Sequence, residues 1–212
     1  MASKTIVIRK GATYKQVLRW ETTPRTYANI TAITKAGPAV LTIPTHGLPD
    51  GWRVDRIVAV GGMKEINTHQ LSAGQFVRTG FGRQFPRGFK ATVVDSNTIK
   101  LLDVNSSSFS TYTTGGQIEY YTPVNLAGYV ARMQIRPSAS SSTILASLTS
   151  AGGDITLDNT AKTITIQIAA TATAAYTFRS GVASLELESS GGVVTLLIDS
   201  APVTIRESDI TR

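Results

Sequence analysis

The stretch that decides the fold is an eight-residue run, Tyr129-Val130-Ala131-Arg132-Met133-Gln134-Ile135-Arg136. Apolar or small side chains occupy every second position from Tyr129 to Ile135, and three of the four positions between them are Arg or Gln. This period of two is typical of a β-strand with one face packed on a core and the other face in water. The run therefore predicts a half-buried strand over residues 129–136.

Short runs of the same kind recur along the chain, with turn residues between them. Candidate strands cover residues 5–9, 14–20, 40–43, 92–94, 98–102, 155–157, 163–168, 183–188, 193–198 and 203–206. Residues 95–97 and 189–192 each separate two of these runs, as hairpin turns do. Pro24 breaks the pattern after the second run, and the only candidate helix, residues 169–175, is too short to be stable alone. Many short strands predict an all-β fold of the sandwich or barrel type.

The composition excludes whole classes of site. None of the 212 residues is a cysteine, so the chain has no disulfide and no thiolate ligand for a metal. The first residues are too polar for a signal peptide, and no window approaches about 18 consecutive apolar residues. We therefore expect a protein made in a reducing cytoplasm, with no membrane partner.

The net charge of +7 is unevenly distributed. Residues 1–136 hold 17 Lys and Arg against 7 Asp and Glu, whereas residues 137–212 hold 4 against 7. A positive face can meet nucleic acid, an anionic surface or an acidic protein partner. The protein partner fits an assembly of many copies, in which opposite faces of neighbours dock.

One group of motifs lies towards both ends of the chain. It comprises Arg9-Lys10-Gly11-Ala12-Thr13-Tyr14, Val124-Asn125-Leu126-Ala127-Gly128-Tyr129, Ile155-Thr156-Leu157, Thr163-Ile164-Thr165-Ile166 and the hairpin of residues 183–198. This group resembles the immunoglobulin-like domain of tailed-phage virion proteins, of the type found in some baseplate upper proteins. In that family about a dozen residues, an ordinary loop length, separate the first two motifs. Here residues 25–122 lie between them.

A second group of motifs fills that gap. It comprises Pro38-Ala39-Val40-Leu41-Thr42, His46-Gly47-Leu48, Asp50-Gly51, Gly61-Gly62-Met63-Lys64-Glu65-Ile66-Asn67, Asn97-Thr98-Ile99-Lys100-Leu101 and Tyr112-Thr113-Thr114-Gly115-Gly116. Their order resembles a repeat of phage proteins that is named FCCH-like, after ubiquitin-activating enzymes. The name implies no ubiquitin chemistry here, because the chain has no cysteine. The stretch from Arg78 to Lys90 departs from the repeat, since it is longer and more basic.

Together the two groups indicate one domain inserted into another. We expect an immunoglobulin-like β-sandwich formed by residues 1–24 and 123–212, interrupted by a small inserted β-barrel or β-sheet domain of residues 25–122. Loops accept such insertions. The cost is small because closure entropy grows only slowly with loop length.

The resemblance implies a structural protein of a tailed-phage particle. It would be a tail, baseplate, neck, collar or fibre-attachment component that acts through protein–protein contacts in a symmetric ring. Its partners would be other copies of itself and other virion proteins, and it would reside in the virion after synthesis in the bacterial host cytoplasm. A capsid cement or decoration protein is an alternative. A host-glycan-binding module is a second alternative, for which exposed Trp or Tyr platforms would be expected.

The sequence offers no catalytic constellation, so we expect no enzyme, no cofactor and no metal. His46 and His69 are the only histidines, fewer nitrogen ligands than zinc normally takes. His46 lies in a Gly- and Pro-rich turn, which indicates bonding to the local backbone. No Gly-x-Ser-x-Gly elbow is present. Asp154 and Asp158 flank a strand without the spacing of an EF-hand loop, which favours turn residues.

The most distinctive stretch runs from Phe76 to Lys90. It holds four of the six phenylalanines, and no Asp or Glu occurs between Ile66 and Val94. Aromatic and Arg side chains are enriched at protein interfaces, and several exposed Phe would form a sticky patch on a monomer. We therefore predict an inter-subunit contact made by Phe76, Arg78, Phe81, Arg83, Phe85, Arg87, Phe89 and Lys90. Packing of this loop on its own domain is one alternative, and stacking on nucleic-acid bases is a less favoured one.

Overall fold

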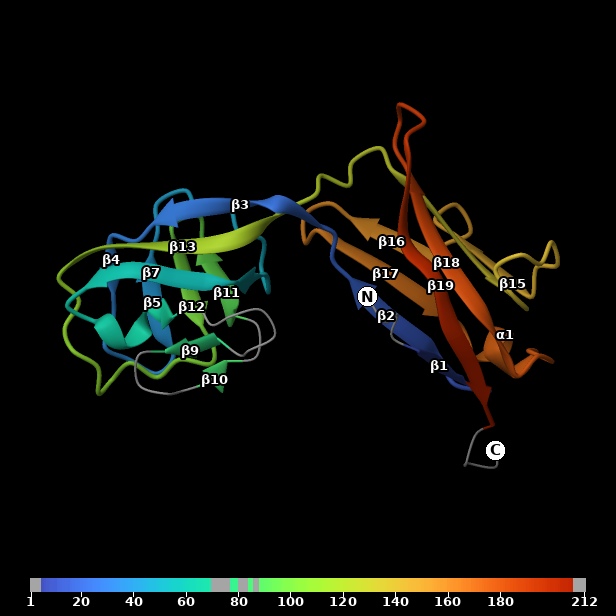
Figure 1. The fold of residues 1–212 in the computed structure, drawn as a ribbon, viewed down its shortest axis with the longest axis horizontal. Coiled ribbons are helices and arrows are strands. Elements are labelled where there is room, and N and C mark those ends of the chain that lie inside the picture. The colour runs from blue at the N-terminus through green and yellow to red at the C-terminus, as the bar shows by residue number, and fades with distance from the viewer. Residues whose placement is uncertain (1–4, 70–76, 80–83, 86–87, 208–212) are drawn as a thin grey trace. The chain divides into compact units, whose positions relative to one another are not determined.

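The computed structural model describes residues 5–69, 77–79, 84–85 and 88–207. This part of the chain forms nineteen β-strands, one short α-helix α1 (Ala170–Ala174) and one 3-10 turn η1 (Lys64–Ile66) (Figure 1). The predicted all-β class is confirmed, and the single predicted helix lies where the sequence indicated it.

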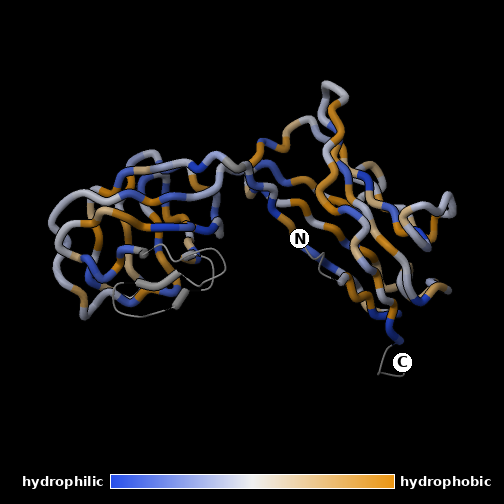
Figure 2. Tube along the Cα trace, viewed as in Figure 1, coloured by the Kyte–Doolittle hydropathy of each residue, from blue (hydrophilic) through white to orange (hydrophobic). Residues whose placement is uncertain are grey.

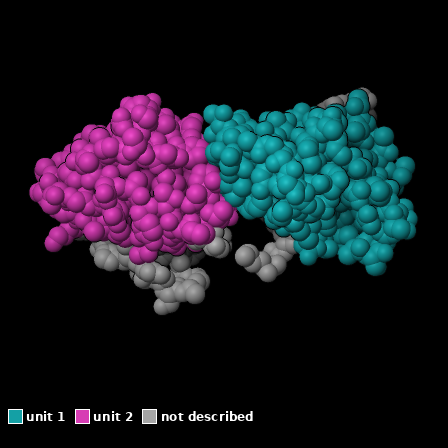
Figure 3. Space-filling model, turned by 90° about the horizontal axis from the view of Figure 1, so that it is seen from above, with its two compact units in different colours: residues 1–20, 124–212 teal, residues 21–123 magenta. Residues whose placement is uncertain are grey.

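The chain divides into two compact units, shown in different colours in Figure 3. Unit 1 comprises residues 1–20 and 124–212, and unit 2 comprises residues 21–123. The sequence motifs predicted that the chain enters the inserted domain after residue 24 and leaves it before residue 123. The chain passes into unit 2 after Trp20 and returns at Val124, and the Val124 N–H donates to the Trp20 carbonyl at 3.1 Å. The two crossings are therefore adjacent, as an insertion requires.

Unit 1 is a sandwich of two sheets. The larger sheet has the order β1-β19-β18-β14-β15, made of β1 (Ile6–Arg9), β19 (Val194–Arg206), β18 (Ser180–Glu188), β14 (Val130–Arg136) and β15 (Ala146–Thr149). The smaller sheet has the order β16-β17-β2, made of β16 (Ile155–Asp158), β17 (Thr163–Ile168) and β2 (Tyr14–Leu18). Taken in chain order, the strands match A′, B, C, C′, D, E, F and G of an immunoglobulin fold, with B, E and D in one sheet. Unit 2 is inserted between B and C.

The core of unit 1 follows the alternation of apolar and polar residues along β14. Ala131, Met133 and Ile135 of β14 are buried, while Val130 and Arg132 are exposed. Figure 2 shows the same alternation of hydrophobic and hydrophilic residues along several strands. Buried residues of both sheets belong to one hydrophobic cluster, so the two inner faces pack on each other.

Unit 2 is built from two larger sheets around its own core, with a short third sheet. The five-stranded sheet has the order β4-β5-β12-β11-β6, made of β4 (Ala32–Ile33), β5 (Ala39–Thr42), β12 (Thr98–Leu101), β11 (Phe89–Asp95) and β6 (Arg53–Val54). The three-stranded sheet has the order β3-β13-β7, made of β3 (Glu21–Asn29), β13 (Thr114–Pro123) and β7 (Arg56–Gly61). The short sheet contains β8 (Thr68–His69), β9 (Val77–Thr79) and β10 (Gln84–Phe85).

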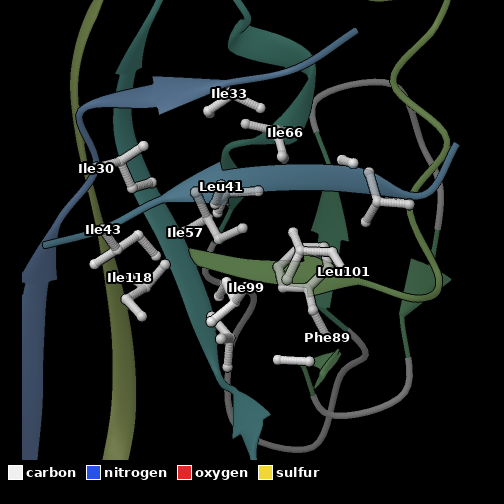
Figure 4. Packing of buried hydrophobic residues seen from close by; sticks show 14 of the residues in the cluster. Ile30, Ile33, Leu41, Ile43, Ile57, Ile66, Phe89, Ile99, Leu101 and Ile118 are labelled. Atoms are coloured by element: carbon white, nitrogen blue, oxygen red, sulfur yellow. The ribbon is translucent and has the colours of Figure 1, made fainter. Parts of the chain in front are cut away.

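The core of unit 2 draws on both larger sheets. Leu41, Phe89 and Ile99 from the five-stranded sheet and Ile57 and Ile118 from the three-stranded sheet are fully buried in one cluster (Figure 4). The cluster also contains the fully buried Trp52. Its members come from strands far apart in the sequence, so the core closes only when residues 21–123 fold together.

The expectation that Pro24 ends the strand pattern is wrong, because β3 continues through it. Proline lacks the N–H that a central strand needs for its ladder, but an edge strand leaves one side unpaired. β3 is the edge of its sheet, and the pairing with β13 is irregular just there, between Tyr121 and Pro123.

Candidate functional site

The stretch from Phe76 to Lys90 is described only in part. Phe76, Phe81, Arg83 and Arg87 lie outside the described residues, and Arg78 and Phe85 are described through the backbone of β9 and β10 alone. Their strands pair antiparallel, with Gln84 opposite Arg78.

The two remaining members of the predicted contact have different positions. Phe89 is fully buried in the core of unit 2, which removes it from any contact with a second chain. The prediction that Phe89 belongs to the inter-subunit contact is therefore wrong, because its ring packs in the core of unit 2. Lys90 is exposed, as expected of the next residue along a strand.

His46 is engaged on both ring nitrogens by the backbone. Its Nδ1 accepts the Leu48 N–H at 2.9 Å, so Nε2 carries the proton and donates to the Asp95 carbonyl at 2.9 Å. The ring is buried, and no lone pair is left for a metal. Within the described residues, no group of three or more His, Asp or Glu side chains is placed to hold a metal ion.

The outer face of the β3-β13-β7 sheet carries an ion-pair network. The Glu119 Oε2 atom accepts from Arg25 Nη1 at 2.8 Å and from Arg56 Nη1 at 3.1 Å. The Arg25 guanidinium also lies 2.9 Å from the Asp55 carboxylate. Two guanidiniums and two carboxylates thus share one part of the sheet face and balance in charge.

Arg25 is held from a third side by Tyr121. Its guanidinium donates to the Tyr121 hydroxyl at 3.4 Å and lies 5.1 Å from the centre of the ring, within cation–π distance. The hydrogen bond to Tyr121 and the carboxylates of Glu119 and Asp55 raise the pKa of Arg25 above its ordinary value, although burial opposes them. This side chain is therefore fixed and permanently charged.

Tyr27 stands next to this network and is open to solvent. It pairs with Glu119 across the β3–β13 ladder, and 57% of the residue is exposed. Two positions along the strand, Asn29 accepts a hydrogen bond from Gln117 Nε2 at 2.8 Å. We call the surface formed by Arg25, Tyr27, Asn29, Arg56, Gln117, Glu119 and Tyr121 the tyrosine face.

Unit 1 has a groove of about 560 Å³ on the outer face of its larger sheet. Its polar lining comes from three adjacent strands: Arg132, Gln134 and Arg136 of β14, Ser184 and Glu186 of β18, and Asp199 of β19. The β14 and β18 positions alternate with core residues of the same strands, so their side chains point away from the core.

Hydrogen bonds fix the polar side chains of this groove. Arg132 donates from Nε to Glu186 Oε1 at 3.0 Å and from Nη2 to Glu188 Oε2 at 2.9 Å. Arg136 donates from Nε and Nη2 to Gln134 Oε1, at 3.1 and 2.7 Å, and from Nη1 to the Ser141 carbonyl at 2.9 Å. The two arginines therefore have defined orientations.

Two register shifts bend β19 where it borders the groove. Glu186 pairs with Leu196, Leu185 with Ile198 and Ala183 with Ala201, so β19 gains one extra residue at each step. Such bulges kink a strand and change the direction of its side chains. Both Asp199 and Ser200, in the second bulge, line the groove.

Ser200 adopts a conformation that is uncommon for a residue other than glycine. Its φ is 49°. Its N–H donates to Ser184 Oγ at 3.1 Å, and its hydroxyl donates to Asp199 Oδ1 at 2.9 Å. These bonds hold the bulge in place on the wall of the groove.

Comparisons with known proteins do not identify a family for this chain. No protein-family model matches the chain, and no curated protein matches it. No helix among the described residues is long and apolar enough to cross a membrane.

No pattern in the sequence indicated the tyrosine face or the groove. Tyr27 and Glu119 are neighbours only through the register of β3 and β13. A periodic pattern shows which face of a strand is polar, but it does not show which strand lies beside it. The bulges that shape the groove likewise depend on strand pairing.

Proposed function

We propose that this chain is a structural component of a tailed-phage particle that acts through protein–protein contacts. It would be part of the tail, baseplate, neck or fibre attachment, present in several copies in a closed ring. The motifs near both ends of the chain and those of the inserted domain, described above, support the phage assignment. They resemble two domain types of phage virion proteins.

The observation that carries the contact role is the exposure of Tyr27 on a sheet face whose other polar side chains are held by ion pairs and hydrogen bonds. Tyr and Arg are, with Trp, the residues that most often dominate binding energy at protein interfaces. Arg25 is already fixed by Glu119, Asp55 and Tyr121, so it loses little conformational entropy when a partner covers it. An exposed ring beside immobilised polar groups is a suitable centre for such a contact.

A capsid cement protein would use the same contacts, and copy number distinguishes the two roles. A tail or neck ring holds on the order of ten copies because of its closed symmetry, whereas a cement protein covers the whole capsid. Quantifying the chain in purified particles, together with electron microscopy of a labelled copy, tests the proposal. Absence of the chain from mature particles would refute it.

The tyrosine face is tested by Tyr27→Ala in the same particles. We expect incorporation to fall at least about tenfold if Tyr27 is a central anchor. The control is Val94→Ala, because Val94 is about as exposed but lies on β11, outside the tyrosine face. Equal incorporation of both variants would show that the tyrosine face is not the contact.

A further inference from the structure

The groove of unit 1 has the size and concavity of a ligand site. Its volume of about 560 Å³ lies within the range typical of small-molecule pockets, roughly 300–1,000 Å³. All of its lining residues belong to one module, so the site is complete within unit 1.

The groove is balanced in charge. Its lining contains two guanidiniums, of Arg132 and Arg136, and two carboxylates, of Glu186 and Asp199. A phosphate or a nucleic-acid backbone would meet the carboxylates, and a cationic ligand would meet the guanidiniums. The groove therefore favours a ligand that is polar but uncharged.

The groove also offers donors and acceptors side by side. Arg132 Nη1 and Gln134 Nε2 are donors, and Glu186 Oε2 and Asp199 Oδ2 are acceptors. None of these four atoms has a hydrogen-bond partner among the residues that the structure describes. A hydroxyl group is both donor and acceptor, so adjacent hydroxyls on one molecule match such an arrangement.

An apolar surface lies beside these polar groups, and it is made of aliphatic side chains instead of the Trp or Tyr platforms that a glycan-binding module was expected to expose. Leu196 is 51% exposed on β19 and lines the groove together with Val182 of β18. A sugar ring has hydroxyls around its edge and C–H groups on its faces, and it can use both kinds of surface together. A peptide would instead seek a free strand edge for its backbone hydrogen bonds, whereas the groove lies on a sheet face.

The polar groups need little reorganisation on binding. Arg132 and Arg136 are already fixed by hydrogen bonds, and the bulge at Asp199 and Ser200 is held by Ser184. An uncommon backbone conformation that the surrounding structure maintains is frequent at functional sites. Preorganised polar groups lower the cost of binding.

We infer that the groove on the outer face of the β1-β19-β18-β14-β15 sheet binds a neutral oligosaccharide. The contacts come from Arg132, Gln134, Glu186 and Asp199 at the hydroxyls and from Leu196 at a ring face. The inference does not depend on the proposed role in the particle, because it uses only the groove of unit 1.

The test begins with the full chain on an array of immobilised neutral and anionic glycans. A neutral glycan bound there is then titrated into ¹⁵N-labelled full chain, with inorganic phosphate and heparin fragments as separate arms. We expect amide shifts centred on Gln134, Ser184 and Ser200. Absence of binding to every neutral glycan, shifts centred elsewhere, or groove binding by phosphate or heparin alone each overturns the inference.

Two variants make the test specific. Asp199→Ala and Gln134→Ala should each weaken the Kd for the bound glycan at least about tenfold, the effect of losing a well-placed polar contact. Thr156→Ala is the matched control, because Thr156 is exposed on β16 in the other sheet of unit 1. Amide spectra of all variants verify folding. An unchanged Kd in both groove variants, or equal weakening in the control, overturns the inference.

Discussion

The Glu119 carboxylate lies 2.8 Å from the Arg25 guanidinium, and only 8% of the Glu119 side chain is exposed. Arg56 reaches the same oxygen at 3.1 Å. Removing the carboxylate would leave two guanidiniums facing each other without their shared anion. The ion pairs of Glu119 with Arg25 and Arg56 are therefore expected to contribute more to the free energy of unfolding of unit 2 than ion pairs at the protein surface usually do.

The first prediction concerns Glu119→Gln, which keeps the shape of the side chain and removes its charge. We expect the free energy of unfolding of unit 2 to fall by about 2 kcal/mol, less than for a fully buried pair because both arginines are partly exposed. Urea unfolding followed by the fluorescence of Trp52, in a Trp20→Phe background, measures it.

The matched control for that change lies in unit 1. Glu186→Gln breaks an ion pair with Arg132 in which both side chains are more than a third exposed. Such pairs contribute at most about 1 kcal/mol, which Trp20 fluorescence in a Trp52→Phe background can follow. Equal losses in the two variants would contradict a special role for Glu119.

A second prediction compares two glycines with nearly the same backbone conformation. Gly88 has φ +83° and Gly153 has φ +84°. A Cβ at Gly88 would lie 2.3 Å from the Val54 carbonyl oxygen, whereas a Cβ at Gly153 would meet nothing within 4 Å. Gly153→Ala should lower the free energy of unfolding of unit 1 by about 1 kcal/mol, because of backbone strain alone.

Alanine at Gly88 should cost clearly more, because β6 must also move away from the added carbon. We expect a loss of about 3 kcal/mol or more in the free energy of unfolding. The Trp52 transition reports Gly88→Ala and the Trp20 transition reports Gly153→Ala. Similar losses would show that β6 yields to the new methyl group at little cost.

A third prediction separates two phenylalanines of the Phe76–Lys90 stretch. Phe89→Ala should lower the free energy of unfolding of unit 2 by about 3–5 kcal/mol, because it opens a cavity in the core. If Phe81 contacts another subunit, Phe81→Ser should leave that free energy unchanged within about 0.5 kcal/mol and reduce incorporation into particles. A Phe81→Ser variant that is both stable and normally incorporated would contradict the contact.

The sequence predicted those parts of the fold that depend on local pattern. The alternation in β14, the hairpin turn before β12 and the short helix α1 all follow from residues close to one another in the chain. β3 and β13 were not predicted from the sequence. Pro24 and the Gly115-Gly116 pair argue against strands unless the edge position and the neighbouring strand are known. The burial of Phe89 was not predicted for a related reason, because composition does not distinguish a buried aromatic side chain from an exposed one.

The last prediction concerns alkaline pH. The Tyr120 hydroxyl donates to the His46 carbonyl at 2.6 Å, and burial raises the pKa of Tyr120 above its ordinary value. The unfolded chain therefore loses the Tyr120 proton at lower pH than the folded chain does. The stabilisation from Tyr120 is complete below the ordinary tyrosine pKa of about 10 and is lost as the pH rises through the raised value.

Tyr120→Phe should accordingly unfold about 1 kcal/mol more easily at pH near 8, because the hydrogen bond to His46 is lost. The difference from the parent chain should shrink above pH of about 10, since phenylalanine has no proton to lose. Urea unfolding followed by Trp52 at a series of pH values measures it, and the absence of cysteine removes disulfide exchange as a competing alkaline reaction. A difference that stays constant up to pH of about 11 would mean that the unfolded and folded states hold the Tyr120 proton equally well.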